Sequence, residues 1–513
     1  MTDIEFEKYL NDSLAALLLH HSDSTSCKEL LTKSFNYAKE KHKDQKRLSG
    51  EPYIVHPIEV AKYVSADKAD TDSICAALLH DTLEDVKGLT KKEMLNDGFP
   101  TVVVDLVYAL TKISSKNKDK NESNMLTTNK LILETVKDPR KIIIKIKDRI
   151  HNMKTIDGHP DMDSRKRIAK QTLEVFVPIT RLLSMYDDKE VLEDTSLEVL
   201  HPDEFKHISM LREKYESDQR LKDFASCRTE TKLSDIVRSK SVDLVKSDVS
   251  RNFSLRFKSK YAIYEELYKK YSKEVPQDLS PEARETLIRY KILETKNLDM
   301  FDDIVKLRIN TNTEADARLA YYAINSIFGQ PSYTRDYIAT PAFNGYQAIH
   351  SCNFIKEINH KIRFEYGTFR MDAYARKGIA TCWNYDYENA VEKMKKFLMS
   401  RPFYEDLIEL CRIYENSEGD SLREENLALG LITRVFNKRI NITFNGDVWQ
   451  VYDKREIDDF VRSKYPVLYD EALVFSVNGI EASRDQKLCD GDVVVANVID
   501  LELGTQRERK DEE

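Results

Sequence analysis

The sequence predicts a multidomain chain with a mostly helical first part, a mixed α and β middle and a small β-rich end. Helices are indicated where apolar residues recur at spacings of three and four, as in "CKELLTKSFNYAKEKH" (27–42) and "HPIEVAKYV" (56–64). In the middle, "DDIVKLRIN" (302–310) and "KIRFEYG" (361–367) are typical of strands. Near the end, "RINITFNGDVWQVYD" (439–453) alternates apolar and polar residues around an Asn-Gly pair, which predicts a β-hairpin.

The same patterns divide the chain into five segments. A length of 513 residues suits roughly three domains of about 150 residues each. We expect a helical domain with its connector at 1–200, a mixed domain at 201–395, a helical linker at 396–436, a β-rich domain at 437–502 and a disordered tail at 503–513. Further helices are expected at 164–186 and 314–328, and further strands at 473–482 and 489–498.

Composition excludes several classes of protein. A net charge of −8 argues against a protein that mainly coats nucleic acid. Seven cysteines without a Cys-x-x-Cys pair indicate reduced thiols in a cytoplasmic setting and no structural zinc site. No window approaches 18 uninterrupted apolar residues, so we expect no membrane span. The acidic start "MTDIEFEKYL" does not resemble a signal peptide.

A first candidate for chemistry is "AALLHDTLED" (76–85), where an apolar helix ends in a histidine and three acids. His80 and Asp81 are adjacent. Glu84 lies four residues after His80, and Asp85 four residues after Asp81, which places the two acids near the pair on one helical face. Divalent metals bind imidazole and carboxylate ligands from separate elements, and His56 is a further candidate. A lone His-Asp pair, however, more often marks a helix end that meets water.

A second helix, "KIIIKIKDRIHNMKT" (141–155), carries two stripes. Apolar residues at core spacing are Ile143, Ile146, Ile150 and Met153. A polar stripe runs beside them through Asp148, Asn152 and Thr155, with His151 three residues after Asp148. Such a stripe alone is usually a solvated face. Together with the two histidine segments it favours a metal site in a cleft.

These segments resemble a known family. "RLSGEPYIVHPIEVAKYV" (47–64), "AALLHDTLEDV" (76–86) and "KIKDRIHNMKT" (145–155) are similar to the hydrolase domain of the RelA/SpoT homologue family, which belongs to the HD superfamily of metal-dependent phosphohydrolases. The resemblance implies an all-α HD-type fold for the first domain. It also implies release of the 3′-pyrophosphate of (p)ppGpp, which leaves GDP or GTP.

The resemblance further implies a role for each residue of the site. A Mn²⁺ ion would be held by His56, His80, Asp81 and Asp148. The attacking water would be oriented or deprotonated by Glu84 and Asp85. The nucleotide pocket would be lined by Arg47, Lys46, Asn152 and Thr155, of which the two basic residues suit a substrate with many phosphate charges.

Residues 252–385 resemble the family's synthetase domain, an α+β nucleotidyltransferase-like fold that transfers pyrophosphate from ATP to GDP or GTP. Five positions match its motifs: Arg256 and Lys258 as phosphate contacts, Asp303 as a Mg²⁺ ligand, Tyr346 as a platform for guanine, and His350. Mg²⁺ is expected only if this site is active. Leu255 and Ser259, on either side of Arg256 and Lys258, replace a glycine and a histidine of the family.

The synthetase pattern then breaks at its catalytic strand. Arg363 stands where the family has a catalytic glutamate, and Gly367 where it has an arginine. Glu365 lies on the same strand face, but about 6.6 Å away, which a catalytic carboxylate does not tolerate. Other departures are Arg376 and Cys382 in place of an acid and a histidine, "YTRD" (333–336) in place of a basic segment, and Ala342 in place of a lysine. We therefore expect a weak or inactive synthetase.

The third domain resembles the family's TGS domain, a β-grasp fold, through "VNGIEASRDQKLCDGDVVVA" (477–496). In long family members this domain helps to bind uncharged tRNA, partly through a histidine whose place Tyr465 takes here. The resemblance thus implies a contact with tRNA or with protein.

Three hypotheses follow. The first is a Mn²⁺-dependent (p)ppGpp 3′-pyrophosphohydrolase with a degenerate synthetase domain. The second is a bifunctional synthetase/hydrolase. The third is a regulatory protein whose domains sense nucleotides without turnover. In each, the partners are guanine nucleotides (ppGpp, pppGpp, GDP and GTP) and no membrane, whereas the preference for guanine over adenine, the regulatory role of the synthetase domain and the oligomeric state stay open.

Overall fold

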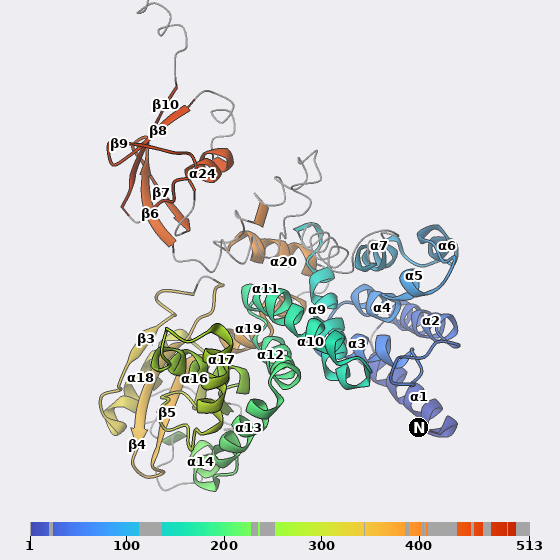
Figure 1. Ribbon diagram of the computed structural model, residues 1–513. Helices are drawn as coiled ribbons and strands as arrows, with labels where there is room; N and C mark the ends of the chain where they lie inside the picture. Colours follow the sequence, from blue (N-terminus) through green and yellow to red (C-terminus); the bar gives the residue numbers. More distant parts are fainter. Residues whose placement is uncertain are drawn as a thin grey trace, which may run out of the picture. The chain divides into compact units, whose positions relative to one another are not determined.

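The structure is a computed structural model of the 513-residue chain. It describes residues 2–19, 24–111, 136–226, 234–235, 252–342, 344–384, 389–401, 404, 407–408, 439–452, 456–464, 473–489 and 491–498. Contacts group residues 1–402 into one compact unit and residues 403–513 into another (Figure 1). No described helix is long and apolar enough to cross a membrane.

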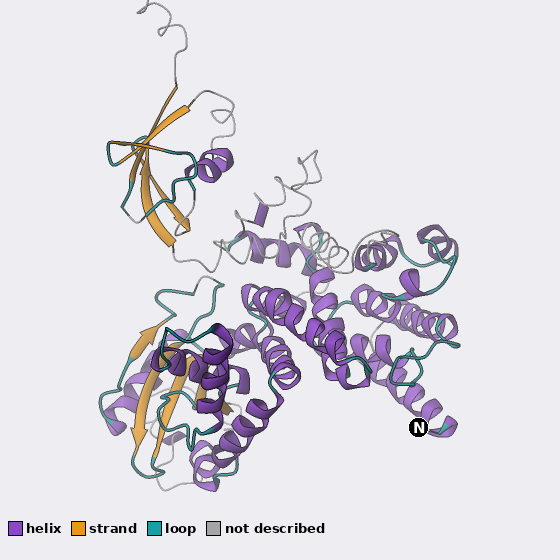
Figure 2. Cartoon of the chain, viewed as in Figure 1, coloured by secondary structure: helices purple, strands orange, loops and turns teal. Residues whose placement is uncertain are grey.

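The first part of the chain is helical, as expected (Figure 2). Its helices are α1 (Asp3–Leu19), α2 (Thr25–Lys41), α3 (Val55–Ala66), α4 (Thr71–Leu79), α5 (Thr82–Asp85), α6 (Lys91–Asn96), α7 (Thr101–Leu110), α9 (Arg140–Lys154), η1 (Ile156–Gly158), α10 (Met162–Gln171), η2 (Thr172–Phe176), α11 (Val177–Leu182), α12 (Tyr186–Leu200), α13 (Pro202–Glu216) and α14 (Gln219–Ala225). The polar loop near 112–135 lies outside the described residues.

Helix α4 is the centre of this region. It packs against α2, α3 and α7, and each of its residues from Ile74 to Leu79 is completely buried. This all-round burial explains why the helix is apolar on every side. Helix α9 packs against α3 and α4, and its predicted core stripe is confirmed, since Ile143, Ile146, Ile150 and Met153 are at most 3% exposed.

The helical segment predicted at 164–186 is interrupted. Helix α10 passes into the π-helical turn η2 before α11 begins. Pro178 stands in the first turn of α11, and it has no N–H to donate to the carbonyl of Glu174. A π-helical turn before the proline relieves the clash of its ring with that carbonyl, which a regular α-helix would impose.

The middle region is built on a five-stranded sheet in the order β1-β2-β5-β4-β3, in which only β2 and β5 run parallel. Its strands are β1 (Phe253–Phe257), β2 (Val305–Thr311), β3 (Thr334–Asp336), β4 (Ile349–Ile355) and β5 (His360–Thr368). Its helices are α16 (Lys260–Glu274), α17 (Pro281–Leu293), α18 (Glu314–Phe328), α19 (Phe369–Lys377), η4 (Gly378–Asn384) and α20 (Ala390–Met399). Helix α18 packs on β2, β4 and β5.

The helical and mixed regions are joined closely within the first unit. The indole Nε1 of Trp383, whose side chain is fully buried, donates to Asp70 Oδ2 at 2.8 Å. Gly378 lies against the backbone of Leu183 and Ser184, just after α11, and the N–H of the next residue, Ile379, donates to Leu183 O at 3.1 Å. A Cβ at position 378 would meet that same carbonyl oxygen at 1.8 Å. Only glycine fits this close approach of two backbones.

The second unit contains a sheet in the order β7-β6-β10-β8-β9, in which β10 runs parallel to β6 and the other neighbours are antiparallel. Its elements are β6 (Arg439–Phe444), β7 (Asp447–Tyr452), α24 (Ile457–Lys464), β8 (Leu473–Val477), β9 (Ile480–Ala482) and β10 (Val493–Val498). The predicted hairpin is confirmed, and Asn445 and Gly446 at its turn both have positive φ. Most of the expected linker, Tyr465 and the tail lie outside the described residues.

Candidate metal centre

The four predicted metal ligands lie together where α3, α4 and α9 meet. His56 is in the first turn of α3, His80 and Asp81 occupy the break between α4 and α5, and Asp148 is on α9. Ligand atoms of His56, His80 and Asp148 all lie within 4.8 Å of one another. Asp81 is adjacent, with its carboxylate oxygens 3.3 Å from His80 Nε2 and 3.4 Å from His56 Nε2.

His80 presents an unoccupied lone pair to this cluster. Its Nδ1 is 2.8 Å from the backbone carbonyl of Ala77, so Nδ1 carries the proton and Nε2 does not. Burial lowers the pKa of His80, which keeps the ring neutral. Nε2 is buried and has no hydrogen-bond partner among the described residues. A buried nitrogen lone pair without a partner, facing two carboxylates, fits a metal ion.

The tautomer of His56 is fixed by its neighbours. Its Nδ1 lies 2.8 Å from Nδ1 of His151, and the same His151 nitrogen lies 3.0 Å from a guanidinium nitrogen of Arg47. Arginine can only donate, so His151 Nδ1 is the acceptor of both bonds and His56 Nδ1 is a donor. His56 Nε2 therefore faces Asp81 and Asp148.

The protonation of these two histidines agrees with that assignment. Burial, with the nearby positive charges of His56 and Arg47, lowers the pKa of His151 to about 3, so this ring is a neutral acceptor. Burial also works against a charged His56, but hydrogen bonds to Asp148 and Asp81 outweigh it and raise its pKa to about 9. Without a metal, a proton on His56 Nε2 thus supplies the positive charge that the two carboxylates require.

Each carboxylate of the cluster is also held from outside. Asp148 Oδ2 accepts from Lys145 Nζ at 2.6 Å, and Oδ1 accepts from Asn152 Nδ2 at 2.6 Å. The Tyr53 hydroxyl donates to Asp81 Oδ2 at 2.7 Å. The positive charges of Lys145 and the histidines overcome burial and hold the pKa of Asp148 well below its usual range. Such outer partners orient ligands and raise metal affinity.

The other predicted residues lie around this cluster at different depths. Arg47 bridges His151 and Asn152, and its second bond, to Asn152 Oδ1, is 2.8 Å long. Glu84 is half-buried and Asp85 is exposed, both on α5. Thr155 ends α9, where its hydroxyl donates to the carbonyl of His151 at 2.9 Å. The exposed residue Lys46 lies in an isolated β-bridge with Pro52.

Three residues of the site were missing from the predicted set: Tyr53, Lys145 and His151. Lys145 is three residues before Asp148 on α9, a spacing that brings side chains together on a helix, whereas Tyr53 lies in the turn before α3. His151 stood in the recognised stripe, but the sequence offered no reason to pair it with His56, 95 positions away. Only the packing of α3 on α9 creates that contact.

The matched synthetase residues form a second cluster in which cations and anions neutralise each other. Lys258 Nζ is 2.6 Å from Asp303 Oδ1, and Arg363 is 3.0 Å from the other oxygen of Asp303. Arg363 also lies 3.1 Å from Glu365. The positive charges of Lys258 and its neighbours overcome burial and lower the pKa of Asp303. The carboxylate at the expected Mg²⁺ position is thus already paired with two cations.

The remaining synthetase residues are held by protein contacts as well. Arg256 is 2.7 Å from Asp372 on α19. The Tyr346 hydroxyl is 2.7 Å from His350 Nε2, and its ring meets Tyr186 of α12 edge-on at 6.1 Å between centroids. Burial lowers the pKa of His350 to about 3, so this ring is neutral.

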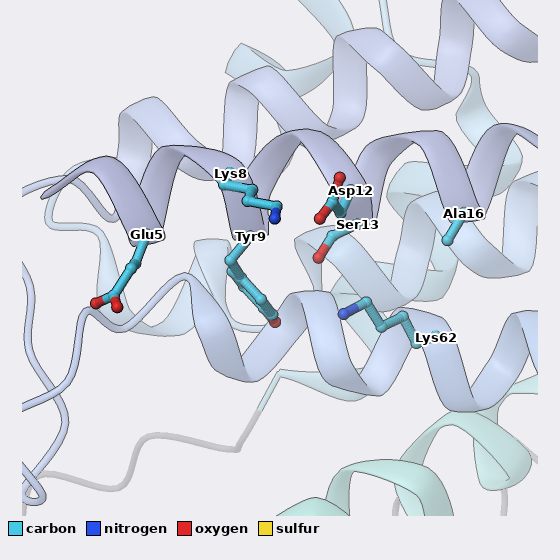
Figure 3. A pocket seen from close by; sticks show the side chains of 7 residues that line it. All are labelled: Glu5, Lys8, Tyr9, Asp12, Ser13, Ala16 and Lys62. Carbon is cyan, nitrogen blue, oxygen red and sulfur yellow. The ribbon is translucent and has the colours of Figure 1, made fainter. Parts of the chain in front are cut away.

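A separate hollow between α1 and α3 is also present in the helical region. Figure 3 shows Tyr9 of α1 and Lys62 of α3 directed toward it. Tyr9 donates to Glu59 of α3 at 2.7 Å, and Lys62 lies 4.5 Å from the centre of the Tyr9 ring. These contacts clamp α1 to the helix whose first turn carries His56. The hollow itself holds none of the predicted site residues.

Comparisons with known proteins identify two domains in the chain. A family model described as "HD domain" matches residues 34–185, and one described as "Region found in RelA / SpoT proteins" matches residues 255–390. A protein of Aquifex aeolicus named guanosine-3′,5′-bis(diphosphate) 3′-pyrophosphohydrolase is 32% identical over 381 residues, which are 74% of this chain and 49% of the relative. A GTP pyrophosphokinase of Myxococcus xanthus is 30% identical over 370 residues, 71% of this chain and 44% of the relative.

A protein of Spiroplasma citri, also named guanosine-3′,5′-bis(diphosphate) 3′-pyrophosphohydrolase, is 28% identical over 512 residues, 96% of this chain and 62% of the relative. The chain thus spans about half the length of the first two relatives. Fold and site define the class as an HD-domain protein with a candidate divalent-metal site of histidines and aspartates. With its second matched region, the chain belongs to the RelA/SpoT homologue family.

Proposed function

We propose that this chain is a Mn²⁺-dependent (p)ppGpp 3′-pyrophosphohydrolase, and that its synthetase is weak or inactive. The observation that carries the first half is the cluster of His56, His80 and Asp148, with the unpartnered Nε2 of His80 beside Asp81. Two imidazoles and two carboxylates form a mixed donor set that accepts Mn²⁺. The names of the relatives from Aquifex aeolicus and Spiroplasma citri support this substrate.

The chain's own residues divide the work around such an ion. A bound divalent ion would lower the pKa of water and neutralise phosphate charge. Contacts with His151 and with the Ala77 carbonyl orient His56 and His80 so that Nε2 of each ring faces the position of the ion. Glu84 and Asp85 lie on the short helix that directly follows Asp81, and we assign them the proton of the attacking water.

The substrate would approach from the side of Arg47. This guanidinium is half-buried and is already oriented by His151 and Asn152, so it can meet a phosphate without loss of its own order. Exposed Lys46 adds positive charge at the same loop, and Thr155 closes the far end of the polar stripe on α9.

The test is to incubate the pure chain with ppGpp and Mn²⁺ and to measure GDP and pyrophosphate. Treatment with a chelator should abolish the reaction, and Mn²⁺ should restore it better than Mg²⁺ or Zn²⁺. Asp81→Ala should lose bound metal and hydrolysis together, because it removes an anionic ligand. Absence of both products from the wild-type protein would refute the proposal, whatever the metal content.

The proposal that the synthetase is weak or inactive depends on the charges around Asp303. A Mg²⁺ ion at Asp303 would have to displace Lys258 and Arg363 from its carboxylate. This double pairing opposes binding of Mg²⁺, and with it of ATP, at Asp303.

Incubation with ATP, GDP and Mg²⁺ should therefore yield no ppGpp. The assay should use a hydrolase-dead variant such as Asp81→Ala, so that hydrolysis does not remove the product, and the mixture should contain no chelator. Accumulation of ppGpp would establish the bifunctional alternative instead.

We also propose that the second unit is a TGS-like module that contacts tRNA or protein, and that the protein works in the cytoplasm. Two hairpins flank a central β10 that runs parallel to β6, and α24 covers the sheet through Ile457, Phe460 and Val461, an arrangement consistent with a β-grasp fold. A gel-shift titration with uncharged tRNA would test the contact with tRNA. No shift at micromolar concentrations of this chain would exclude tRNA, and the expected partner would then be another protein.

A further inference from the structure

His42 is a buried histidine at the end of α2, outside the set of predicted site residues. Its backbone N–H donates to the carbonyl of Ala38 at 3.0 Å, so the residue caps the helix. Only 1% of His42 is exposed, and Nε2 of its ring is buried without a hydrogen-bond partner among the described residues. A buried polar atom without a partner lowers stability, and native proteins carry few of them. Stability alone therefore does not explain a histidine at this position.

The other ring nitrogen of His42 is joined to α5 by one side chain. Nδ1 lies 2.7 Å from Gln45 Oε1, and Gln45 Nε2 lies 3.0 Å from the backbone carbonyl oxygen of Asp85. A carbonyl can only accept, so the amide nitrogen of Gln45 faces Asp85 and the amide oxygen faces His42. His42 Nδ1 therefore carries the proton, and Nε2 carries the lone pair that has no partner.

The ring of His42 also supports Tyr53. The two rings are stacked, with 4.9 Å between their centroids and 23° between their planes. The backbone N–H of Tyr53 donates to the carbonyl of Gln45 at 3.0 Å, which joins the same two segments a second time. From this position the Tyr53 hydroxyl donates to Asp81 Oδ2 at 2.7 Å. Burial, with the nearby negative charges of Asp81 and Asp85, raises the pKa of Tyr53, so the hydroxyl keeps the proton that it donates.

We propose that His42 is a positioning residue of the hydrolase centre. Its ring supports Tyr53, which holds the ligand Asp81. Its Nδ1–H directs the amide of Gln45 to the backbone of Asp85, to which we assign the proton of the attacking water. Carboxylates that are held from outside bind metal more tightly, and a catalytic group displaced by about 1 Å loses much of its effect. The inference rests on the proposed function and adds to it a residue that touches neither metal nor substrate.

Two substitutions separate the two contacts of His42. His42→Phe keeps an aromatic ring against Tyr53 but removes the N–H that orients Gln45. His42→Asn keeps an N–H close to the position of Nδ1 but removes the ring. The experiment titrates the full chain and both variants with Mn²⁺ by calorimetry, and then measures kcat and KM for ppGpp at saturating Mn²⁺. A melting curve accompanies each variant.

The two variants should lose different properties. His42→Phe should bind Mn²⁺ as the wild-type chain does and lose about 10–100-fold in kcat at an unchanged KM, because only the backbone of α5 loses its tether. Its melting temperature should stay that of the wild-type chain, since the unpartnered lone pair disappears together with one hydrogen bond. His42→Asn should bind Mn²⁺ about tenfold more weakly and keep most of kcat at saturating Mn²⁺, because Tyr53 loses its support.

The matched control is His207→Asn, the same substitution at a histidine of the mixed region whose Nε2 lies 2.8 Å from the carbonyl oxygen of Thr295. It should leave both the Mn²⁺ affinity and kcat unchanged. Equal losses of Mn²⁺ affinity and kcat in both His42 variants, or no loss in either variant, would overturn the proposal.

Two further outcomes are also decisive. If His42→Asn does not fold, His42→Phe decides alone, because a positioning role requires that kcat falls while Mn²⁺ affinity and melting temperature are kept. A wild-type chain that does not hydrolyse ppGpp would refute the proposed function. The Mn²⁺ affinities of the two variants would then still decide whether His42 supports Asp81, since that comparison needs no turnover.

Discussion

At the scale of single residues, the geometry of the candidate metal centre depends on a histidine that is not a predicted ligand. His151 accepts hydrogen bonds from both Arg47 and His56, and this fixes the proton of His56 on Nδ1. The other nitrogen is thereby directed to Asp81 and Asp148. Residues that orient a ligand in this way commonly account for a large part of metal affinity.

Replacement of His151 by leucine should weaken binding of Mn²⁺ by about 10–100-fold, because His56 loses the acceptor that fixes its tautomer. His151→Asn is the matched variant, since its amide oxygen can take the place of Nδ1 as acceptor and should retain most of the affinity. Metal titration monitored by calorimetry distinguishes the two. Equal affinities for the leucine and asparagine variants would show that His151 does not orient His56.

At the scale of elements, β5 separates residues of the core from residues of the proposed synthetase site. Phe364 and Tyr366 point into the core and are fully buried. Arg363 and Glu365 lie on the other face and form an ion pair of 3.1 Å. Alternation along the strand keeps the two faces independent, so the catalytic face can change while the core face is preserved.

Glu365 provides a pH-dependent contribution to stability. The positive charge of Arg363 overcomes burial and lowers the pKa of Glu365 to about 2. A lowered pKa means that the folded state favours the charged form, so its contribution is complete above the unfolded value of about 4.3 and is lost as the pH falls toward about 2.

Glu365→Gln should therefore reduce the free energy of unfolding at pH 7 by about 3 kcal/mol, because the half-buried Arg363 loses one partner. Urea unfolding of both proteins at several pH values should show this difference shrink below pH of about 4. Glu357→Gln, at an exposed position near the turn before β5, is the control and should behave like the wild type. A difference independent of pH would contradict the role of the charge.

At the scale of the whole molecule, the described contacts join the helical and mixed regions into one unit. Lys377 contributes by donating to the carbonyl of Ala66 at 2.7 Å and pairing with Asp67 at 3.1 Å. Trp383 donates to Asp70, which also caps α4. Changes around η4 can thus reach α4, whose end carries His80 and Asp81.

Gly378→Ala should disrupt this junction. The backbone at Gly378 has positive φ, and an added Cβ would meet the Leu183 carbonyl at 1.8 Å. The matched control is Gly329→Ala, which also has positive φ but open space around it. In both variants the strained backbone should lower the free energy of unfolding by about 1–3 kcal/mol. Only in Gly378→Ala should the loss be larger, because of the contact with Leu183.

Urea unfolding measures that difference, and limited proteolysis reports whether the two regions separate. We expect Gly378→Ala to be the less stable variant and to expose the chain around α11 and α12 to protease. Equal stability of the two variants would mean that the contact with Leu183 relaxes without cost.

Much of the fold followed from local patterns, because side-chain periods and turn residues act over a few positions. The helix at 314–328 was predicted with its bounds, and the Asn445-Gly446 hairpin followed from the positive φ that its turn demands. The interruption at η2 was missed, since it arises from one proline inside an otherwise regular pattern. The linker and the tail stay predictions.

For the site, the sequence by itself determined the residue types, which are two histidines, two aspartates and a following pair of acids at helical spacing, while their roles stay predictions. Only the tertiary structure decided how they meet. The His56–His151 bond, the unpartnered Nε2 of His80 and the double pairing of Asp303 each join residues far apart in sequence or depend on burial. Periodicity acts along the chain, whereas proton positions and charge balance depend on neighbours brought together by packing.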